Sequence, residues 1–252
     1  MGYYINCLKR SGSLQKDIKE LIPDMNLRRR MSRVVKTGVA TGVESLIEFD
    51  EYGSVDAIVT ATGLGCISDS EKFLANMILS EEQMLNPTLF IQSTFNTVSA
   101  QIALLRSLHC YNNTFTHRYT SFESAVADAM LQLDIHGAKA VLVGVFDEAT
   151  PAVETIMRRM GLLKGKMLGE GAIFFVLTTV KLKCSVAEIV SLSFDAEAKE
   201  PTVSVNETNG SCWCGCIAET IGNLIFDGKY KEFDAINDVD GIKKSVIRVR
   251  CL

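Results

Sequence analysis

The chain has 252 residues, of which 47% are hydrophobic, so it can bury a substantial core as one large or two small domains. Its formal net charge of -4 gives no reason to expect nucleic-acid binding. The longest apolar stretches have the length of strands rather than the roughly 20 residues of a membrane span, and the N-terminus lacks a signal-peptide pattern. Eight cysteines without such a signal predict free thiols, and we expect a cytoplasmic protein without a membrane span.

Apolar periodicity predicts that helices and strands alternate along most of the chain. Apolar residues recur at helical spacing between Ser32 and Phe49, and the serine can cap this helix. In chain order the expected elements are helix 32–49, strand 57–60, helix 69–79, strand 88–92, helix 96–108, strand 111–117, helix 121–133, strand 140–145 and helix 152–160, the last begun by Pro151. Nearly continuous apolar strands between amphipathic helices predict an α/β fold, with a largely parallel sheet that helices cover on both faces.

The segment 111–147 carries the clearest functional signal. A strand is followed by a turn at residues 118–121, here called the nucleophile turn, and then by a helix. Backbone N–H groups at such a strand end and helix start can stabilise developing negative charge. If the strand continues into the turn, His117 and Tyr119 point to the same face. The segment therefore predicts the place of a nucleophile, and the candidate pocket or interface residues are His117, Arg118, Tyr119, Thr120 and Ser121.

Four blocks in chain order resemble the ketoacyl synthases of the thiolase superfamily. They are 22–36 with its Met31-Ser32-Arg33 step, 56–65, 86–97, and 169–177, which opens with Gly-Glu-Gly-Ala. More closely, they resemble the ketoacyl-synthase-like N-terminal family found in bacterial polyketide and aryl-polyene-type gene sets. The resemblance implies a thiolase-like layered fold. It also implies an intact N-terminal half over 1–194 and a strongly reduced C-terminal segment over 195–252 that packs on the same core.

In these synthases a cysteine occupies the nucleophile position, and the resemblance places Tyr119 there. The synthase reaction needs a thiolate, whereas a phenol with a pKa near about 10 is almost wholly protonated at neutral pH. The resemblance also places Thr208 and Cys216 at the positions of the two catalytic histidines, and no histidine follows His136 in the chain. Losing members of such a catalytic unit costs several powers of ten in rate. We therefore expect no catalytic residue.

The remaining reactive side chains suggest no further site. The cysteines at 212, 214 and 216 lack a second ligand pair, because all three histidines lie far upstream, so packed thiols near a helix start are expected rather than a metal site. Ser121 and Ser124 are expected to cap a helix. Gly63-Leu64-Gly65 is too short for a phosphate-binding loop, and no cofactor is expected.

The resemblance leaves two main hypotheses. In the first, the chain is a catalytically degenerate homologue that pairs with an intact ketoacyl synthase, as chain-length factors do, in a type II polyketide, fatty-acid or aryl-polyene-type pathway. In that family the dimer forms across the N-terminal halves, and a homodimer is the alternative assembly. In the second, the chain is an acyl-carrier-protein-dependent acyltransferase or decarboxylase that needs no cysteine.

An acyl carrier protein is a further candidate partner. A carrier presents acidic helices and a phosphate, and the basic run Arg28, Arg29 and Arg30 is the candidate contact for them. The alternative interpretation of this run is a solvated helix entry or a subunit contact. A scaffold that only binds the carrier is a third and weaker hypothesis.

Overall fold

The computed structural model describes residues 2–163, 165–194, 197–205, 211–239 and 243–252. In these residues nine strands form one sheet in the order β3-β2-β4-β6-β1-β7-β11-β10-β8, and β5 and β9 form a separate pair. The strands are β1 Tyr3–Arg10, β2 Ala57–Ala61, β3 Tyr111–Phe115, β4 Ala140–Asp147, β5 Met167–Leu168, β6 Gly171–Thr178, β7 Ser185–Phe194, β8 Thr202–Ser204, β9 Ser211–Cys212, β10 Glu232–Val239 and β11 Lys243–Cys251.

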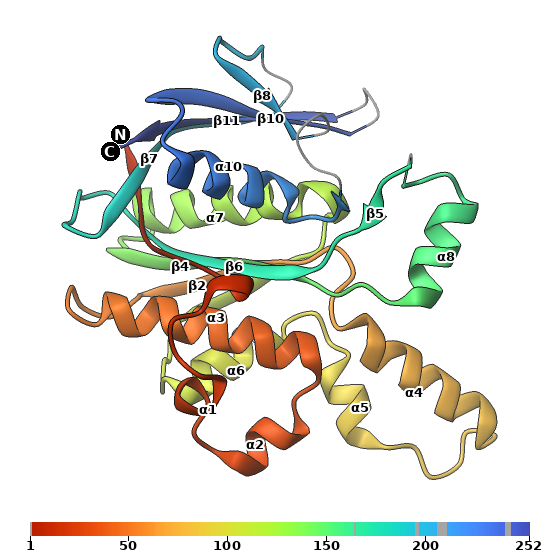
Figure 1. The fold of residues 1–252 in the computed structure, drawn as a ribbon. Helices are drawn as coiled ribbons and strands as arrows, with labels where there is room; N and C mark the ends of the chain where they lie inside the picture. Colours follow the sequence, from red (N-terminus) through yellow and green to blue (C-terminus); the bar gives the residue numbers. More distant parts are fainter. Residues whose placement is uncertain (1, 164, 195–196, 206–210, 240–242) are drawn as a thin grey trace.

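Helices cover both faces of this sheet (Figure 1), and two separate hydrophobic clusters result. The α-helices are α1 Ile18–Leu21, α2 Met25–Arg30, α3 Arg33–Phe49, α4 Ile67–Leu79, α5 Pro87–Gln92, α6 Thr97–Leu105, α7 Ser121–Asp134, α8 Pro151–Arg159 and α10 Cys216–Asp227, and the 3-10 helices are η1 Ser11–Ser13 and η2 Arg118–Thr120. Helices α7 and α10 pack on one face, and α3 and α6 pack on the other.

Strand β4 shows why the central strands have nearly continuous apolar sequences. Val141, Val143 and Val145 point into the cluster under α7, whereas Leu142 and Phe146 point into the cluster under α3. Every residue of β4 is buried. Side chains alternate between the two faces of a strand, so a sheet covered on both sides needs apolar residues at every position.

The prediction of a largely parallel sheet is wrong, because the sheet is mixed. Strands β3, β2 and β4 are parallel, as are β10 and β8. The five other neighbouring pairs are antiparallel, among them β4 with β6 and β1 with β7. An antiparallel strand that is buried on both faces is as apolar as a parallel one, so the apolar pattern carried no information on strand direction.

Two local predictions are also wrong. Residues 88–92 form helix α5 rather than a strand. The Asn86 side chain accepts a hydrogen bond from the backbone amide of Thr88, and Pro87 occupies the first turn, so both residues favour a helix start. Ser32 precedes α3, but its side chain makes no capping hydrogen bond. The backbone amide of Ser32 donates instead to Gln92 Oε1 at 3.2 Å, which attaches the start of α3 to the end of α5.

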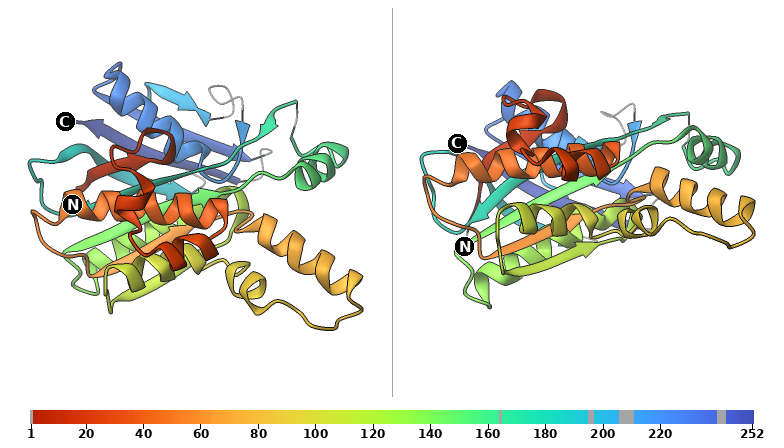
Figure 2. Two further views of the ribbon diagram at one scale, coloured as in Figure 1. Left: turned by 60° about the horizontal axis from the view of Figure 1, so that its bottom comes forward. Right: turned by 90° about the horizontal axis from the view of Figure 1, so that it is seen from below.

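The other predicted helices and strands are present, with shifts of a few residues at their ends. Helices α4 and α5 extend away from the sheet as a projecting unit, here called the α4–α5 arm, residues 67–92 (Figures 1 and 2). In the described part of the chain, no helix is both long and apolar enough to span a membrane.

Candidate functional site

Asp147, the last residue of β4, connects two loops at the end of the sheet. Its carboxylate is buried, and Oδ1 accepts hydrogen bonds from the Thr62 hydroxyl at 2.7 Å, the Gly63 amide at 3.0 Å and the Leu64 amide at 2.8 Å. Oδ2 lies 3.4 Å from the amide of Cys214, which precedes α10. A buried carboxylate with several amide donors is a strong organising contact. We call this group of residues the Asp147 junction.

The nucleophile turn lies against this junction. A Cβ atom added to Gly63 would lie 3.1 Å from Asp147 Oδ2, 3.4 Å from Cys214 Cβ and 3.6 Å from the carbonyl oxygen of Arg118. Arg118 itself has φ +56, the left-handed conformation that is uncommon for residues other than glycine. The structure therefore brings the nucleophile turn, the glycine turn after β2 and the loop before α10 to one place.

Within the turn, the backbone of Tyr119 is held from the C-terminal part of the chain. Its carbonyl accepts a hydrogen bond from the Asn237 side chain on β10 at 2.9 Å. The expectation that His117 and Tyr119 share a strand face is wrong, because β3 ends at Phe115 and Tyr119 lies in η2. His117 is exposed, and its Nδ1 lies 2.9 Å from the hydroxyl of Ser124.

The expectation that Ser121 and Ser124 cap helix α7 is wrong. Ser121 Oγ donates to the carbonyl of Arg118 at 2.7 Å, and Ser124 Oγ donates to the carbonyl of Thr120 at 2.9 Å. Both hydroxyls therefore bond to carbonyls in the turn rather than to free amides of the helix, because the chain enters α7 through the 3-10 turn η2.

Glu123 forms a buried polar cluster behind the turn. It is fully buried in the first turn of α7, and its Oε1 accepts from Asn237 at 2.7 Å and from Ser245 on β11 at 2.6 Å. Its other oxygen has no hydrogen-bond partner among the described residues. Burial raises the pKa of this carboxyl, although the two hydrogen bonds work in the opposite direction. The Asn237 amide donates to both Glu123 and Tyr119, so the cluster links the turn to the hairpin of β10 and β11.

The thiols near the turn are packed rather than exposed. Cys216 is the first residue of α10 and is buried, with its sulfur 3.2 Å from the amide of Trp213. Cys214 is also buried, and burial, followed by the charge of Asp147, raises the pKa of its thiol well above the ordinary range. Thr208 lies outside the described residues. Where the chain is described, no group of three or more histidine, cysteine or acidic side chains is placed to hold a metal ion.

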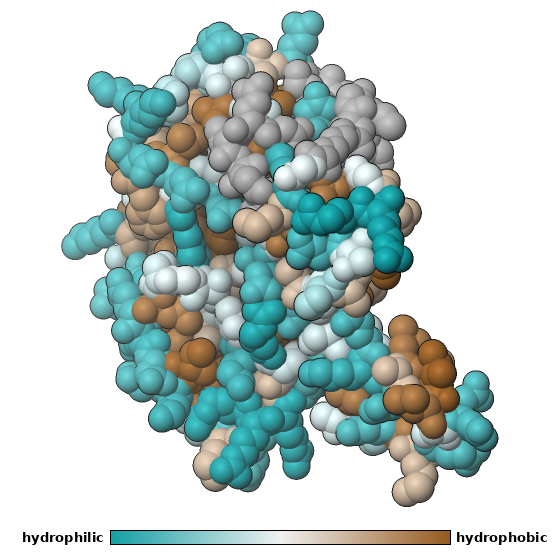
Figure 3. Space-filling model, turned by 45° about the vertical axis from the view of Figure 1, so that its right-hand side comes forward, coloured by the Kyte–Doolittle hydropathy of each residue, from teal (hydrophilic) through white to brown (hydrophobic). Residues whose placement is uncertain are grey.

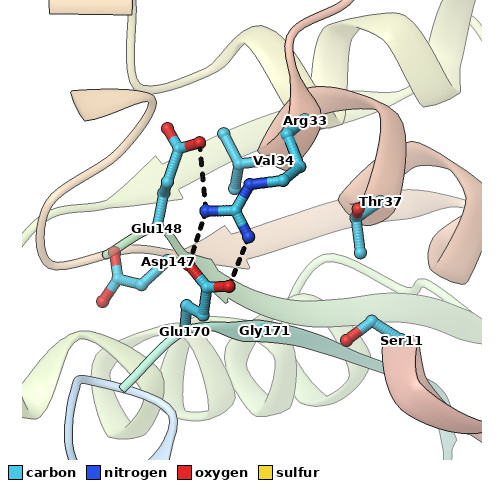
Figure 4. A pocket seen from close by; sticks show the side chains of 8 residues that line it. All are labelled: Ser11, Arg33, Val34, Thr37, Asp147, Glu148, Glu170 and Gly171. Atoms are coloured by element: carbon cyan, nitrogen blue, oxygen red, sulfur yellow. Dashed lines mark hydrogen bonds and ion pairs between the residues drawn. The ribbon is translucent and has the colours of Figure 1, made fainter. Parts of the chain in front are cut away.

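A second cluster surrounds Arg33, at the start of α3. A cavity of about 120 Å³ is lined by Ser11, Arg33, Val34, Thr37, Asp147, Glu148, Glu170 and Gly171. Arg33 points between two carboxylates, with Nη2 2.6 Å from Glu170 Oε2 and 3.6 Å from Glu148 Oε1 (Figure 4). The pKa of Glu170 is lowered, first by its hydrogen bond to Arg33. These carboxylates are already bonded within the protein, so the cluster is part of the scaffold.

The blocks that carried the resemblance meet in these two clusters. Arg33 comes from the first block, the Thr62–Gly63 turn from the second and Glu170 from the fourth, while Gln92 of the third holds the start of α3. Asp147 and Glu123 were not singled out in the sequence. An acid at the end of an apolar strand, and another in the buried face of a helix, were the available signals. Arg28, Arg29 and Arg30 lie on α2, and none of them lines the cavity at Arg33.

Comparison with known proteins agrees with this arrangement. A family model described as beta-ketoacyl synthase, N-terminal domain, matches residues 9–208. The chain belongs to this family. No curated protein matches the chain. Solved structures share its mixed α/β, thiolase-like fold at sequence identities too low to show more than the fold.

Three of these structures illustrate the similarity. The ishigamide ketosynthase/chain length factor is 12% identical, with a TM-score of 0.78 over 100% of both chains. The ketosynthase ApeO in complex with its chain length factor ApeC, from Xenorhabdus doucetiae, is 14% identical, with a TM-score of 0.67 over 99% of both chains. The AntDE:AntF complex, a type II acyl-carrier protein with its ketosynthase, is 11% identical, with a TM-score of 0.73 over 100% of this chain and 99% of the other.

Proposed function

We propose that this member of the ketoacyl synthase family is a catalytically silent, chain-length-factor-like subunit that pairs with an active ketosynthase. The observation that carries the proposal is the nucleophile turn. The family resemblance implies a cysteine at the position of Tyr119, and in the structure the Asn237 side chain donates a hydrogen bond to the backbone carbonyl of Tyr119. A tyrosine hydroxyl is a poor replacement for a thiolate in thioester formation.

On this proposal, the thiols that lie near the nucleophile turn do not replace the missing nucleophile. Burial raises the pKa of Cys214 and of Cys66, the latter next to the glycine turn, so both hold their protons at neutral pH. The chain also contains no histidine after His136, which leaves the C-terminal segment without an imidazole for oxyanion stabilisation. The proposed correspondences of Thr208 and Cys216 to the family's histidines fit this picture. The proposed division at residues 194 and 195 assigns both of these positions to the reduced segment.

The surface of the α4–α5 arm supports the pairing half of the proposal. Apolar side chains gather on the projecting part of the molecule at the lower right of Figure 3, and the exposed ones on the arm are Leu74, Ile78, Leu79, Met84, Phe90 and Ile91. Ile78 and Leu79 are 74% and 83% exposed. Neighbouring apolar side chains that are exposed together are typical of a surface that binds another protein. Strand β3 lies at one end of the sheet, and a partner strand could extend it there.

The proposed partner is an intact ketosynthase subunit, with a second copy of this chain as the alternative. Two of the similar structures are described as ketosynthases together with chain length factors, and a third includes an acyl-carrier protein. An acyl carrier protein is therefore a further proposed partner, with Arg28, Arg29 and Arg30 as its contact. Residues 117–121 would then form a pocket wall or subunit contact rather than a catalytic site.

Co-expression with a ketosynthase from the same gene neighbourhood tests the pairing. We expect a stable heterodimer, and Ile78→Asp should weaken it at least about tenfold because a charge on the arm must be buried on association. Ile135→Asp is the matched control, since Ile135 is 70% exposed at the end of α7, outside the arm. Failure to co-purify, together with a well-behaved homodimer of this chain alone, would contradict the proposal.

Incubation of the isolated chain with acylated or malonylated carrier protein tests whether the chain is catalytically inactive. We expect no covalent mass increase and no release of carbon dioxide. A mass increase that Tyr119→Phe abolishes would favour the alternative hypothesis, an acyltransferase or decarboxylase that needs no cysteine.

A further inference from the structure

Cys7 and Cys184 form a pair of neighbouring thiols away from the nucleophile turn. Cys7 lies on β1, and Cys184 directly precedes β7. These two strands are antiparallel, and Asn6 of β1 pairs with Ser185 of β7. Cys7 and Cys184 are the next residues beyond this pair, with Cys7 still on β1 and Cys184 in the turn before β7, so we infer that the two cysteines lie across from each other where the ladder ends. Opposed residues of antiparallel strands have Cα atoms about 4.5–5.5 Å apart, within the range that a disulfide spans.

Side-chain contacts support this placement. Cys184 Sγ lies 3.8 Å from Oδ1 of Asn6, the residue that directly precedes Cys7. Both cysteines are free thiols and belong to the same hydrophobic region, on the α3 face of the sheet.

The backbone at Cys7 is unusual. Its φ is +52, and β1 shifts its register on both sides here, between Asn6 and Lys9 against β6 and between Ile5 and Asn6 against β7. A bulge of this kind re-aims side chains, and strained backbone at a residue other than glycine often accompanies a functional contact.

We propose that Cys7 and Cys184 are a redox-sensitive pair that closes to a disulfide when an oxidant such as hydrogen peroxide reaches Cys184. The two thiols differ in access, because Cys7 is 1% exposed and Cys184 is half-buried. Burial, followed by the contact with Cys184, raises the pKa of Cys7, so Cys7 is a poor first target for the oxidant.

The chemistry proceeds in two balanced steps. Peroxide transfers one oxygen to the Cys184 sulfur as its O–O bond breaks, which gives a sulfenic acid and one water. The Cys7 sulfur then attacks the Cys184 sulfur, so that the S–S bond forms and the S–O bond breaks. The hydroxyl group leaves with the Cys7 proton as the second water. The product links β1 to the start of β7, and the proximity of the two sulfurs favours this step over reaction with a second molecule.

Peptide mapping of the full-length reduced protein after peroxide treatment tests the proposal. We expect the loss of two hydrogens in mass, a cross-linked peptide pair containing Cys7 and Cys184, and full reversal by a dithiol reductant. Cys7→Ser should leave a sulfenic acid on Cys184 that dimedone traps, whereas Cys184→Ser should show neither product. Cys110→Ser is the matched control, because Cys110 is also half-buried but its neighbour is the carboxylate of Asp56.

The wild-type map alone decides the matter if a variant fails to fold. Dimedone-labelled Cys184 without a cross-link, or both thiols still reduced after a dose that oxidises Cys110, would overturn the proposal.

Discussion

The Asp147 junction and the nucleophile turn lie side by side but differ in what they contain. At the junction, Asp147 alone accepts three hydrogen bonds at one oxygen from the turn at residues 62–64. At the turn, the backbone path from strand to helix is present, but Tyr119 stands at the proposed nucleophile position. The fold therefore depends on contacts that do not require a catalytic residue in the turn. A chain can keep the scaffold contacts of the junction and still lack the nucleophile of the turn.

Removing Asp147 gives the largest expected effect on the scaffold. Asp147→Ala leaves the Thr62 hydroxyl and the amides of Gly63 and Leu64 without their acceptor in a buried place, so we expect a loss of about 3–5 kcal/mol in the free energy of unfolding. Denaturant unfolding followed by the fluorescence of Trp213, the single tryptophan, measures this loss. Asp147→Asn keeps one acceptor oxygen and should lose clearly less. Equal losses for both variants would show that the charge, not the hydrogen bonds, stabilises the junction.

Glu123 tests whether the turn is held by the C-terminal hairpin. Glu123→Ala leaves Asn237 and Ser245 without this acceptor, so we expect the free energy of unfolding to fall by about 2–3 kcal/mol, measured by denaturant unfolding. Glu123→Gln keeps an acceptor oxygen and removes the buried charge, so at neutral pH it should be at least as stable as the wild type.

The same residue predicts a pH dependence. Because burial raises the pKa of Glu123 in the folded state, its contribution to stability is complete below the unfolded pKa of about 4.3 and is lost as the pH rises through the folded pKa. The advantage of Glu123→Gln over the wild type should therefore grow as the pH rises through this window. A difference that stays constant with pH would show that Glu123 is not perturbed by burial.

Arg33 gives the smallest expected effect. Its side chain is 60% exposed, so solvent screens its ion pairs with Glu170 and Glu148. We expect Arg33→Ala to lower the free energy of unfolding by about 1 kcal/mol or less, and high salt should reduce the difference. A loss as large as that of Asp147→Ala would mean that the ion pairs of Arg33 stabilise the fold as much as the junction does.

The comparison also shows what could be predicted from the sequence. Helices such as α3 and α7 were predictable because one face of each is apolar at helical spacing, and β4 because its sequence is a nearly continuous apolar run. The strand, turn and helix around Tyr119 followed from the same pattern. Strand direction did not, because a doubly covered strand has the same composition in either direction.

Long-range polar contacts were the other part that could not be predicted. Glu123 meets Asn237 and Ser245, which are 114 and 122 residues away in the chain. Nothing in a single sequence links these positions. Helix α5 was a different kind of error, because the Asn86-Pro87 start signal was present and a run of strand-favouring residues outweighed it.

The central proposal is that this chain pairs with an active ketosynthase and does not itself perform the condensation. Turnover by the reconstituted pair, measured after replacing only the nucleophilic cysteine of the ketosynthase partner with alanine, tests it most directly. We predict that all condensation is lost and that adding Tyr119→Cys to this chain restores none of it. Product formed by this chain alone, or by its pair with the inactivated partner, would contradict the account.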